Sequence, residues 1–122
     1  MKTIVTHIGP DLDAMTAIWL LKTFFPEWKE ASLAFVPAGK TLHNAPPDEN
    51  PEIIHVDTGF GKFDHHQTDA DTCAAQLIYQ ELKKTKGSNE ALARMVEVVN
   101  ETDHFREVFF PNPTADFWDF SI

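Results

Sequence analysis

Aspartate and histidine side chains gather in three short segments of this 122-residue chain. The segments are His7-Ile8-Gly9-Pro10-Asp11-Leu12-Asp13, Asp57-Thr58-Gly59 and Asp64-His65-His66. A fourth candidate, Asp103, follows the last helical pattern of the chain. Carboxylates and imidazoles are ligands that Mn²⁺, Mg²⁺ and Zn²⁺ take in proteins. The combination predicts a metal site, although each segment alone has an ordinary structural explanation.

The charges of these residues favour two ions over one. Two carboxylates at ~4 Å repel each other by roughly 4 kcal/mol when the effective dielectric constant is about 20. Four aspartates are candidate ligands, with a charge of −4 that two divalent cations would balance: Asp11, Asp13, Asp57 and Asp103. A donor set rich in oxygen with some nitrogen suits Mn²⁺ first, with Mg²⁺, Co²⁺ or Zn²⁺ as alternatives.

The same residues have structural alternatives. Asp11 or Asp13 at the start of a helix can be an N-cap, where the helix dipole favours a negative charge. Asp57 can close an Asx-turn with the two residues after it, but a carboxylate that ends an apolar strand is costly to bury without a partner or a metal. The neighbouring side chains of His65 and His66 should point apart, so that one binds a metal while the other faces a substrate.

Strands alternate with helices along the chain. Apolar runs predict three strands, at residues 3–6, 32–36 and 53–57, and the first and third should be buried. Apolar residues at helical spacing predict three helices: residues 12–25, a helix that begins at Asp69 or Asp71 and ends before Gly87, and a helix that begins at Ser88 or Asn89. This order predicts an α/β fold of minimal length with a parallel-sheet core flanked by helices. Two of the acidic segments then follow the carboxyl ends of strands, where open α/β sheets build their sites.

Three further histidines and the single cysteine lie outside these segments, and the sequence predicts an environment for each. His43 lies in a proline-rich loop and should be solvated, whereas His55 alternates with apolar residues and should be a satisfied packing residue. Cys73 should be a buried, inert thiol. His104 is adjacent to Asp103 and could contact the site.

The order and spacing of these motifs resemble the DHH phosphoesterase superfamily over roughly residues 1–105. The shared features are a strand that ends in H-x-x-x-D-x-D, a strand that ends in D, a D-H-H tripeptide and a later acid. The resemblance implies that His7, Asp11 and Asp57 hold one metal ion. It implies that Asp13, Asp57, His65 and Asp103 hold a second, so that Asp57 bridges the two.

The resemblance also implies an activity. Members hydrolyse phosphodiester or phosphoanhydride bonds, usually with Mn²⁺, and two ions generate a bridging hydroxide that attacks phosphorus in line. His66 would face the substrate phosphate, and Asp64 would orient a histidine that binds a metal. The implied protein is a hydrolase that cleaves a nucleotide or a short oligonucleotide, with Asp57, Asp64 and His66 as its catalytic residues.

Family members usually carry a second, C-terminal domain that grips the substrate, and nothing in these 122 residues resembles it. A minimal enzyme, a partner-dependent subunit and a fragment therefore remain alternatives. The alternative function is a metal-binding module without independent catalysis, acting as a subunit or a regulatory domain. Residues 106–122 form a separate aromatic-rich tail that should pack on the domain of residues 1–105, or on a homodimer partner or partner domain.

Composition narrows the class of protein. The net charge of −9 argues against broad nucleic-acid binding, which relies on lysine and arginine to displace counterions, but it allows a small phosphorylated substrate. The sequence contains no apolar stretch of transmembrane length, so we expect no membrane insertion. A single cysteine allows no internal disulfide, and together with the missing signal peptide it predicts a cytoplasmic protein.

Overall fold

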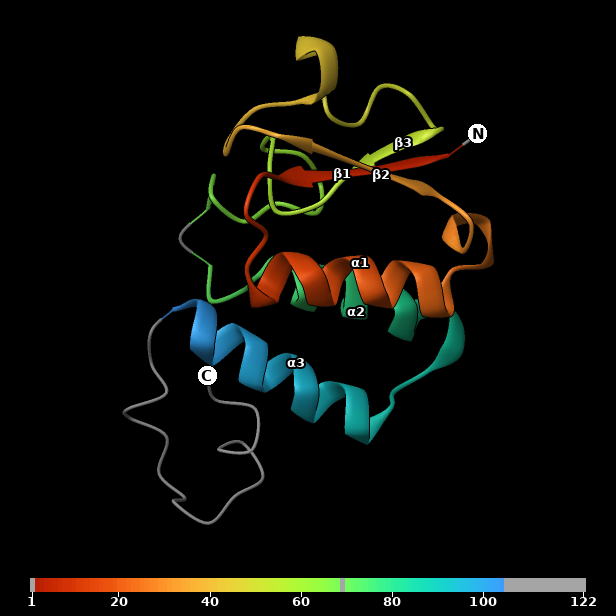
Figure 1. The fold of residues 1–122 in the computed structure, drawn as a ribbon. Helices are drawn as coiled ribbons and strands as arrows, with labels where there is room; N and C mark the ends of the chain where they lie inside the picture. The colour runs from red at the N-terminus through yellow and green to blue at the C-terminus, as the bar shows by residue number, and fades with distance from the viewer. Residues whose placement is uncertain (1, 69, 105–122) are drawn as a thin grey trace.

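A computed structural model of the protein describes residues 2–68 and 70–104. In these residues a small sheet lies over a layer of two helices, and a third helix packs on the far side of that layer (Figure 1). The predicted tail, residues 106–122, and the predicted helix cap Asp69 lie outside the described residues. The chain is therefore a three-layer α/β structure over the part that the structure describes.

The sheet has three parallel strands in the order β2-β1-β3, namely β1 (Thr3–His7), β2 (Ser32–Val36) and β3 (Ile53–His55). This confirms the predicted parallel α/β class. The chain passes from the central β1 to one neighbour and then crosses to the other side of it. The carboxyl ends of β1 and β3 consequently flank a topological switch point, which is the usual place for a binding crevice.

The helices are α1 (Leu12–Phe24), α2 (Ala74–Lys86) and α3 (Glu90–Asp103), and short 3-10 turns occupy Pro26–Trp28 and Leu42–Asn44. Local signals explain their ends. Asn89 caps α3 by accepting a hydrogen bond from the Leu92 N–H group, and Gly87 ends α2 with φ of 76°. The helix predictions are thus correct to within a few residues, except at the start of α2.

The start of α2 differs from the prediction. Cys73 is the N-cap residue and its side chain makes no capping hydrogen bond, whereas Asp71 instead accepts a hydrogen bond from Asn100 on α3. The first N–H groups of α2, those of Ala74 and Ala75, donate to the two carboxylate oxygens of Asp13, at 3.0 and 2.9 Å. A cap supplied by a residue 61 positions away leaves no local sequence signal.

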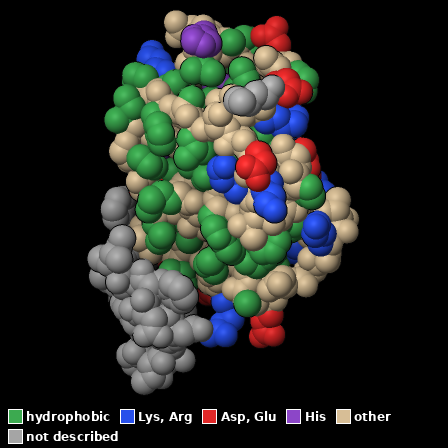
Figure 2. All heavy atoms as spheres, turned by 45° about the vertical axis from the view of Figure 1, so that its right-hand side comes forward, with side chains coloured by type: hydrophobic (Ala, Val, Ile, Leu, Met, Phe, Trp, Pro, Cys, Tyr) green, Lys and Arg blue, Asp and Glu red, His purple; other side chains and the backbone are tan. Residues whose placement is uncertain are grey.

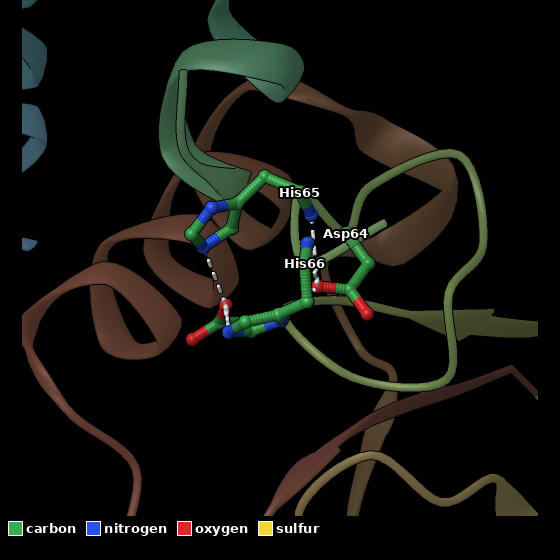
Figure 3. A group of neighbouring side chains, drawn as sticks. Asp64, His65 and His66 are labelled. Atoms are coloured by element: carbon green, nitrogen blue, oxygen red, sulfur yellow. Dashed lines mark hydrogen bonds and ion pairs between the residues drawn. The ribbon is translucent and has the colours of Figure 1, made fainter. Parts of the chain in front are cut away.

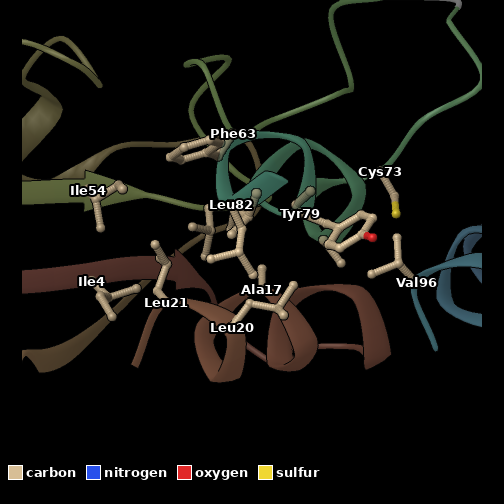
Figure 4. Close-up of a cluster of buried hydrophobic side chains, with 14 of the residues drawn as sticks. Ile4, Ala17, Leu20, Leu21, Ile54, Phe63, Cys73, Tyr79, Leu82 and Val96 are labelled. Atoms are coloured by element: carbon tan, nitrogen blue, oxygen red, sulfur yellow. The ribbon is translucent and has the colours of Figure 1, made fainter. Parts of the chain in front are cut away.

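The core lies between the sheet and the layer formed by α1 and α2 (Figure 4). Ile4 and Ile54 from the sheet, Leu20 and Leu21 from α1, and Ile78 from α2 are almost completely buried there. Cys73 joins the same cluster as a free, buried thiol, as predicted. Burial of these side chains fixes the strand ends relative to the helix starts.

The edge of the molecule at β2 stays apolar but uncovered in the described residues. Leu33 and Phe35 on β2, with Met15 and Trp19 on α1, expose between 45% and 52% of their surface. Hydrophobic side chains accordingly cover much of the face shown in Figure 2. Within residues 2–68 and 70–104, every helix is too short or too polar to cross a bilayer.

Candidate metal centre

The predicted donor segments meet at the carboxyl ends of β1 and β3. His7 is the last residue of β1, and Asp57 follows β3 by two residues. Asp11 is the N-cap residue of α1, and Asp103 is the last residue of α3. Residues far apart in the sequence are therefore brought to one point of the fold, at the topological switch point.

His7, Asp11 and Asp57 form the first donor group, and one ligand atom from each lies within 4.8 Å of the others. Nε2 of His7 is 3.1 Å from Oδ2 of Asp57 and 4.0 Å from Oδ1 of Asp11. Asp11 also serves as the N-cap of α1, because its Oδ1 accepts the Ala14 N–H group at 2.9 Å. Asp11 therefore caps α1 and also belongs to a group of side chains that could bind a metal ion.

The second donor group surrounds Nε2 of His65. This atom is 3.2 Å from Oδ1 of Asp57, 3.3 Å from Oδ2 of Asp103 and 3.6 Å from Oδ2 of Asp13. The three carboxylates come from the end of β3, the end of α3 and the first turn of α1. All four side chains that the sequence assigned to a second ion thus converge.

Asp57 lies between the two groups. Its side chain is only 2% exposed, and one oxygen faces His7 while the other faces His65. Its backbone has φ of 57°, a left-handed conformation that is uncommon for aspartate and ends the strand abruptly. The hydrogen bond of its side chain goes to His7. The Asx-turn alternative is therefore not what these contacts show.

Two atoms of this cluster are buried without a hydrogen bond, Oδ1 of Asp57 and Nε2 of His65. They face each other at 3.2 Å, but their geometry does not make a hydrogen bond. Buried polar atoms in folded proteins are almost always satisfied, and an exception calls for an explanation such as an ion. A cation between these atoms would satisfy both, so the residues present fit a divalent metal.

The acid-base properties also reflect an excess of buried carboxylates. Burial and the charges of Asp57 and Asp103 raise the pKa of Asp13 to about 7. Burial likewise raises the pKa of Asp103. The interaction with Asp57, and the charges of Asp103 and Asp13, raise the pKa of His65 to about 9 against the effect of burial. Burial alone would raise the pKa of Asp57, but the ion pair with His65 and the hydrogen bond with His7 hold it below its usual value.

Asp64 organises the loop that carries the two histidines (Figure 3). Its Oδ1 accepts hydrogen bonds from the backbone N–H groups of His65 and His66 and from the His66 ring nitrogen Nδ1. Its Oδ2 accepts the Phe60 N–H group at 2.8 Å. The histidine that Asp64 orients is therefore His66, which also belongs to a group that could hold a metal, with Asp57, Asp64 and His65.

The prediction that His65 and His66 point apart is wrong. Their ring centroids lie 4.4 Å apart and their planes are inclined by only 32°. Side chains alternate in an extended strand, but residues 65–68 form a turn, closed by the Thr68 N–H group and the His65 carbonyl oxygen at 3.2 Å, so neighbouring rings can lie on one side. Nε2 of His66 lies 4.0 Å from Oδ1 of Asp57, and both rings consequently face the cluster.

The structure adds His104 to the surroundings of the site. Its ring centroid is 6.1 Å from that of His65, and it forms a third potential donor group with His65 and Asp103. Its Nδ1 is 2.7 Å from the Asn100 carbonyl oxygen, which anchors the ring at the end of α3. His43 is exposed, and His55 is buried between the Pro47 carbonyl and the Leu42 N–H group, both as predicted.

Two pockets open on the cluster. One of about 450 Å³ is lined by His7, Asp11, Ala38, Gly39, Asp57, Phe60 and His66. The other, of about 320 Å³, is lined by residues that include Asp11, Asp13 and Asp103. A third pocket of about 470 Å³ lies along the proline-rich loop around residues 42–55 and contains none of the described donor groups. Sequence reasoning missed the contribution of Phe60 and residues 38–39, because nothing in their type indicates a position beside the cluster.

No family model, curated protein or solved structure matches this chain.

Proposed function

We propose that the protein is a metal-dependent phosphohydrolase of the DHH phosphoesterase type. It would cleave a phosphodiester or phosphoanhydride bond in a nucleotide or a short oligonucleotide. The observation that carries this proposal is the position of Asp57, whose two oxygens face two separate donor groups, at 3.1 Å from His7 and 3.2 Å from His65. Paired divalent cations that share a carboxylate are typical of enzymes that displace a group at phosphorus.

The donor groups suggest which residues would hold the ions. His7, Asp11 and Asp57 would hold the first, and a second would lie among four side chains: Asp13, Asp57, His65 and Asp103. Mn²⁺ is the expected ion for these oxygen and nitrogen donors. When bound, two such cations lower the pKa of a water molecule and neutralise the charge of phosphate oxygens.

His66 would be the side chain of this protein that acts directly on the substrate phosphate. Its Nδ1 is bound to Asp64, so its Nε2 is directed toward the pocket that Asp57 and His7 line. The carboxylate bound to Nδ1 fixes the orientation of the ring. Nε2 of His66 is therefore the ring nitrogen placed to exchange a hydrogen bond or a proton with a phosphate oxygen or the leaving oxygen. Asp64 acts through His66 as a positioning residue.

A second candidate function has its own support. Within the described residues, neither pocket beside the cluster is lined by lysine or arginine, which usually neutralise the phosphates of a substrate. This observation favours a metal-binding module without independent catalysis, in which a partner would complete the site. The two functions differ in whether bound metal gives turnover.

The decisive experiment measures Mn²⁺-dependent hydrolysis of a nitrophenyl phosphodiester together with the number of bound ions. Asp57→Asn removes the negative charge that the two donor groups share, and it should abolish both turnover and the binding of two ions. Glu81→Gln is the matched control, because Glu81 is exposed on α2 and pairs with Lys84 away from the cluster. Two bound ions without turnover would favour the module. A protein that binds no Mn²⁺ would refute both functions.

A further inference from the structure

A large aromatic side chain stands in solvent beside the candidate metal centre. Phe60 is 56% exposed, although phenylalanine is among the residues most often buried. It lines the pocket of about 450 Å³ together with His7, Asp57 and His66. An exposed ring at the opening of a polar pocket is therefore available to a molecule that enters it.

The backbone that carries this ring is held in an unusual conformation. Phe60 has φ of 60°, in the left-handed region that a bulky residue rarely adopts. The conformation is fixed because its N–H group donates to Oδ2 of Asp64 at 2.8 Å. Gly59 precedes it at φ of 84°, where a Cβ atom would approach Cγ2 of Thr41 to 2.7 Å. Unusual backbone of this kind persists where the surrounding structure enforces it, often at binding sites.

The other lining residues leave room for a flat group. Ala38 and Gly39 line the same pocket without bulky side chains, and a Cβ atom built on Gly39 would meet nothing within 4 Å. Among the described residues, no lysine or arginine lines this pocket. Binding there must rely on the donor cluster, with whatever ions it holds, and on contact with the Phe60 ring.

We infer that Phe60 is a stacking platform for the nucleobase of the substrate. A nucleotide has the two groups that this pocket accommodates, a phosphate for the metal donors and a flat aromatic base for the ring. The inference rests on the proposed function for the position of the phosphate, and it adds the reason why a nucleotide is favoured over a phosphate ester without a base. Phe60 is thus a specificity residue.

The first test measures binding, which does not depend on turnover. We expect the full chain with Mn²⁺ to bind adenosine monophosphate more tightly than ribose 5-phosphate by roughly 5- to 150-fold, the range known for the stacking of a base on an aromatic side chain. Phe60→Leu should remove this preference, and Phe60→Trp should restore it. Quenching of the fluorescence of a 2-aminopurine nucleotide should be lost in the leucine variant alone.

Phe35→Leu is the matched control. Phe35 is also an exposed phenylalanine, at 48%, but it lies on β2 and outside the residues that line this pocket. This variant should keep the preference for the nucleotide. Equal affinity for the two ligands in the wild type, or equal loss in the Phe35 and Phe60 variants, would overturn the inference.

A second test separates this inference from the proposed function. The wild type should hydrolyse a dinucleotide with a lower KM than the same dinucleotide without its bases, and Phe60→Leu should raise the KM only for the first. Hydrolysis of both with no effect of Phe60→Leu would refute the stacking role and leave the hydrolase intact. If neither is hydrolysed, the proposed activity fails, and the binding comparison still decides whether Phe60 stacks on a base.

Discussion

Without metal, the free energy of unfolding should fall as the pH rises from 6.5 to 9. The pKa values of Asp13 and His65 are raised in the folded protein to about 7 and about 9. A group with a raised pKa binds its proton more tightly in the folded state, so its stabilising contribution is lost as the pH rises through that value. His7 and Asp103 also have raised pKa values and act in the same direction.

The shifts give the size of the effect. The Asp13 carboxyl changes from 3.8 to about 7 and the His65 imidazole from 6.5 to about 9. One pKa unit corresponds to about 1.4 kcal/mol, so each shift amounts to roughly 3–4 kcal/mol. The two groups face each other at 3.6 Å and share part of that energy. Most of the Asp13 shift lies below pH 6.5, whereas the His65 shift falls inside the window. We therefore expect a loss of roughly 3 kcal/mol across the window, mainly from His65.

Urea unfolding in the presence of a chelator measures this loss, with the fluorescence of Trp19 and Trp28 as the signal. The lower limit of pH 6.5 is chosen because burial lowers the pKa of His55, whose stabilising effect is lost only as the pH falls below 6.5. Asp13→Asn should reduce the fall of the unfolding free energy with rising pH. Saturating Mn²⁺ should also oppose this fall, because it neutralises the carboxylates. A metal-free protein whose stability is constant or rises over this window would refute the electrostatic reasoning.

Two further variants test the site and the core. Asp64→Asn leaves the His66 ring without its charged partner, so we expect kcat to fall about tenfold or more in the hydrolysis assay while Mn²⁺ binding persists; an unchanged kcat would remove His66 from the mechanism. Leu20→Ala opens a cavity in a fully buried position and should cost about 2–5 kcal/mol in urea unfolding, against less than 1 kcal/mol for Leu33→Ala on the exposed edge. Similar losses for the two leucine variants would show that the core is placed wrongly.

Most of the fold could be predicted from local patterns. Apolar runs locate β1 and β2. Helical spacing together with Gly87 and Asn89 locates the C-terminal end of α2 and the start of α3. The start of α2 could not be predicted, because its cap is the carboxylate of Asp13 in another helix. Long-range hydrogen bonds of this kind depend on packing and leave no periodicity in the sequence.

The donor residues could be predicted from their types and from their position after strands, and the fold brings them together. The orientation of neighbouring side chains could not. His65 and His66 lie on the same side because the loop turns, and Asp64 consequently reaches His66. Phe60 has no sequence signal at all, since its position depends on a left-handed backbone that Asp64 stabilises.

Asp11 and Asp13 show that the structural and the functional explanation of one residue need not exclude each other. Asp11 caps α1 with one oxygen, and Asp13 caps α2 with both, yet each also faces the donor cluster. A carboxylate oxygen has two lone pairs, so it can accept an N–H group and still face a cation. The caps fix these carboxylates before any metal binds, and the cluster keeps a repulsion that a cation would relieve. Metal binding and helix stability should therefore be coupled through these two side chains.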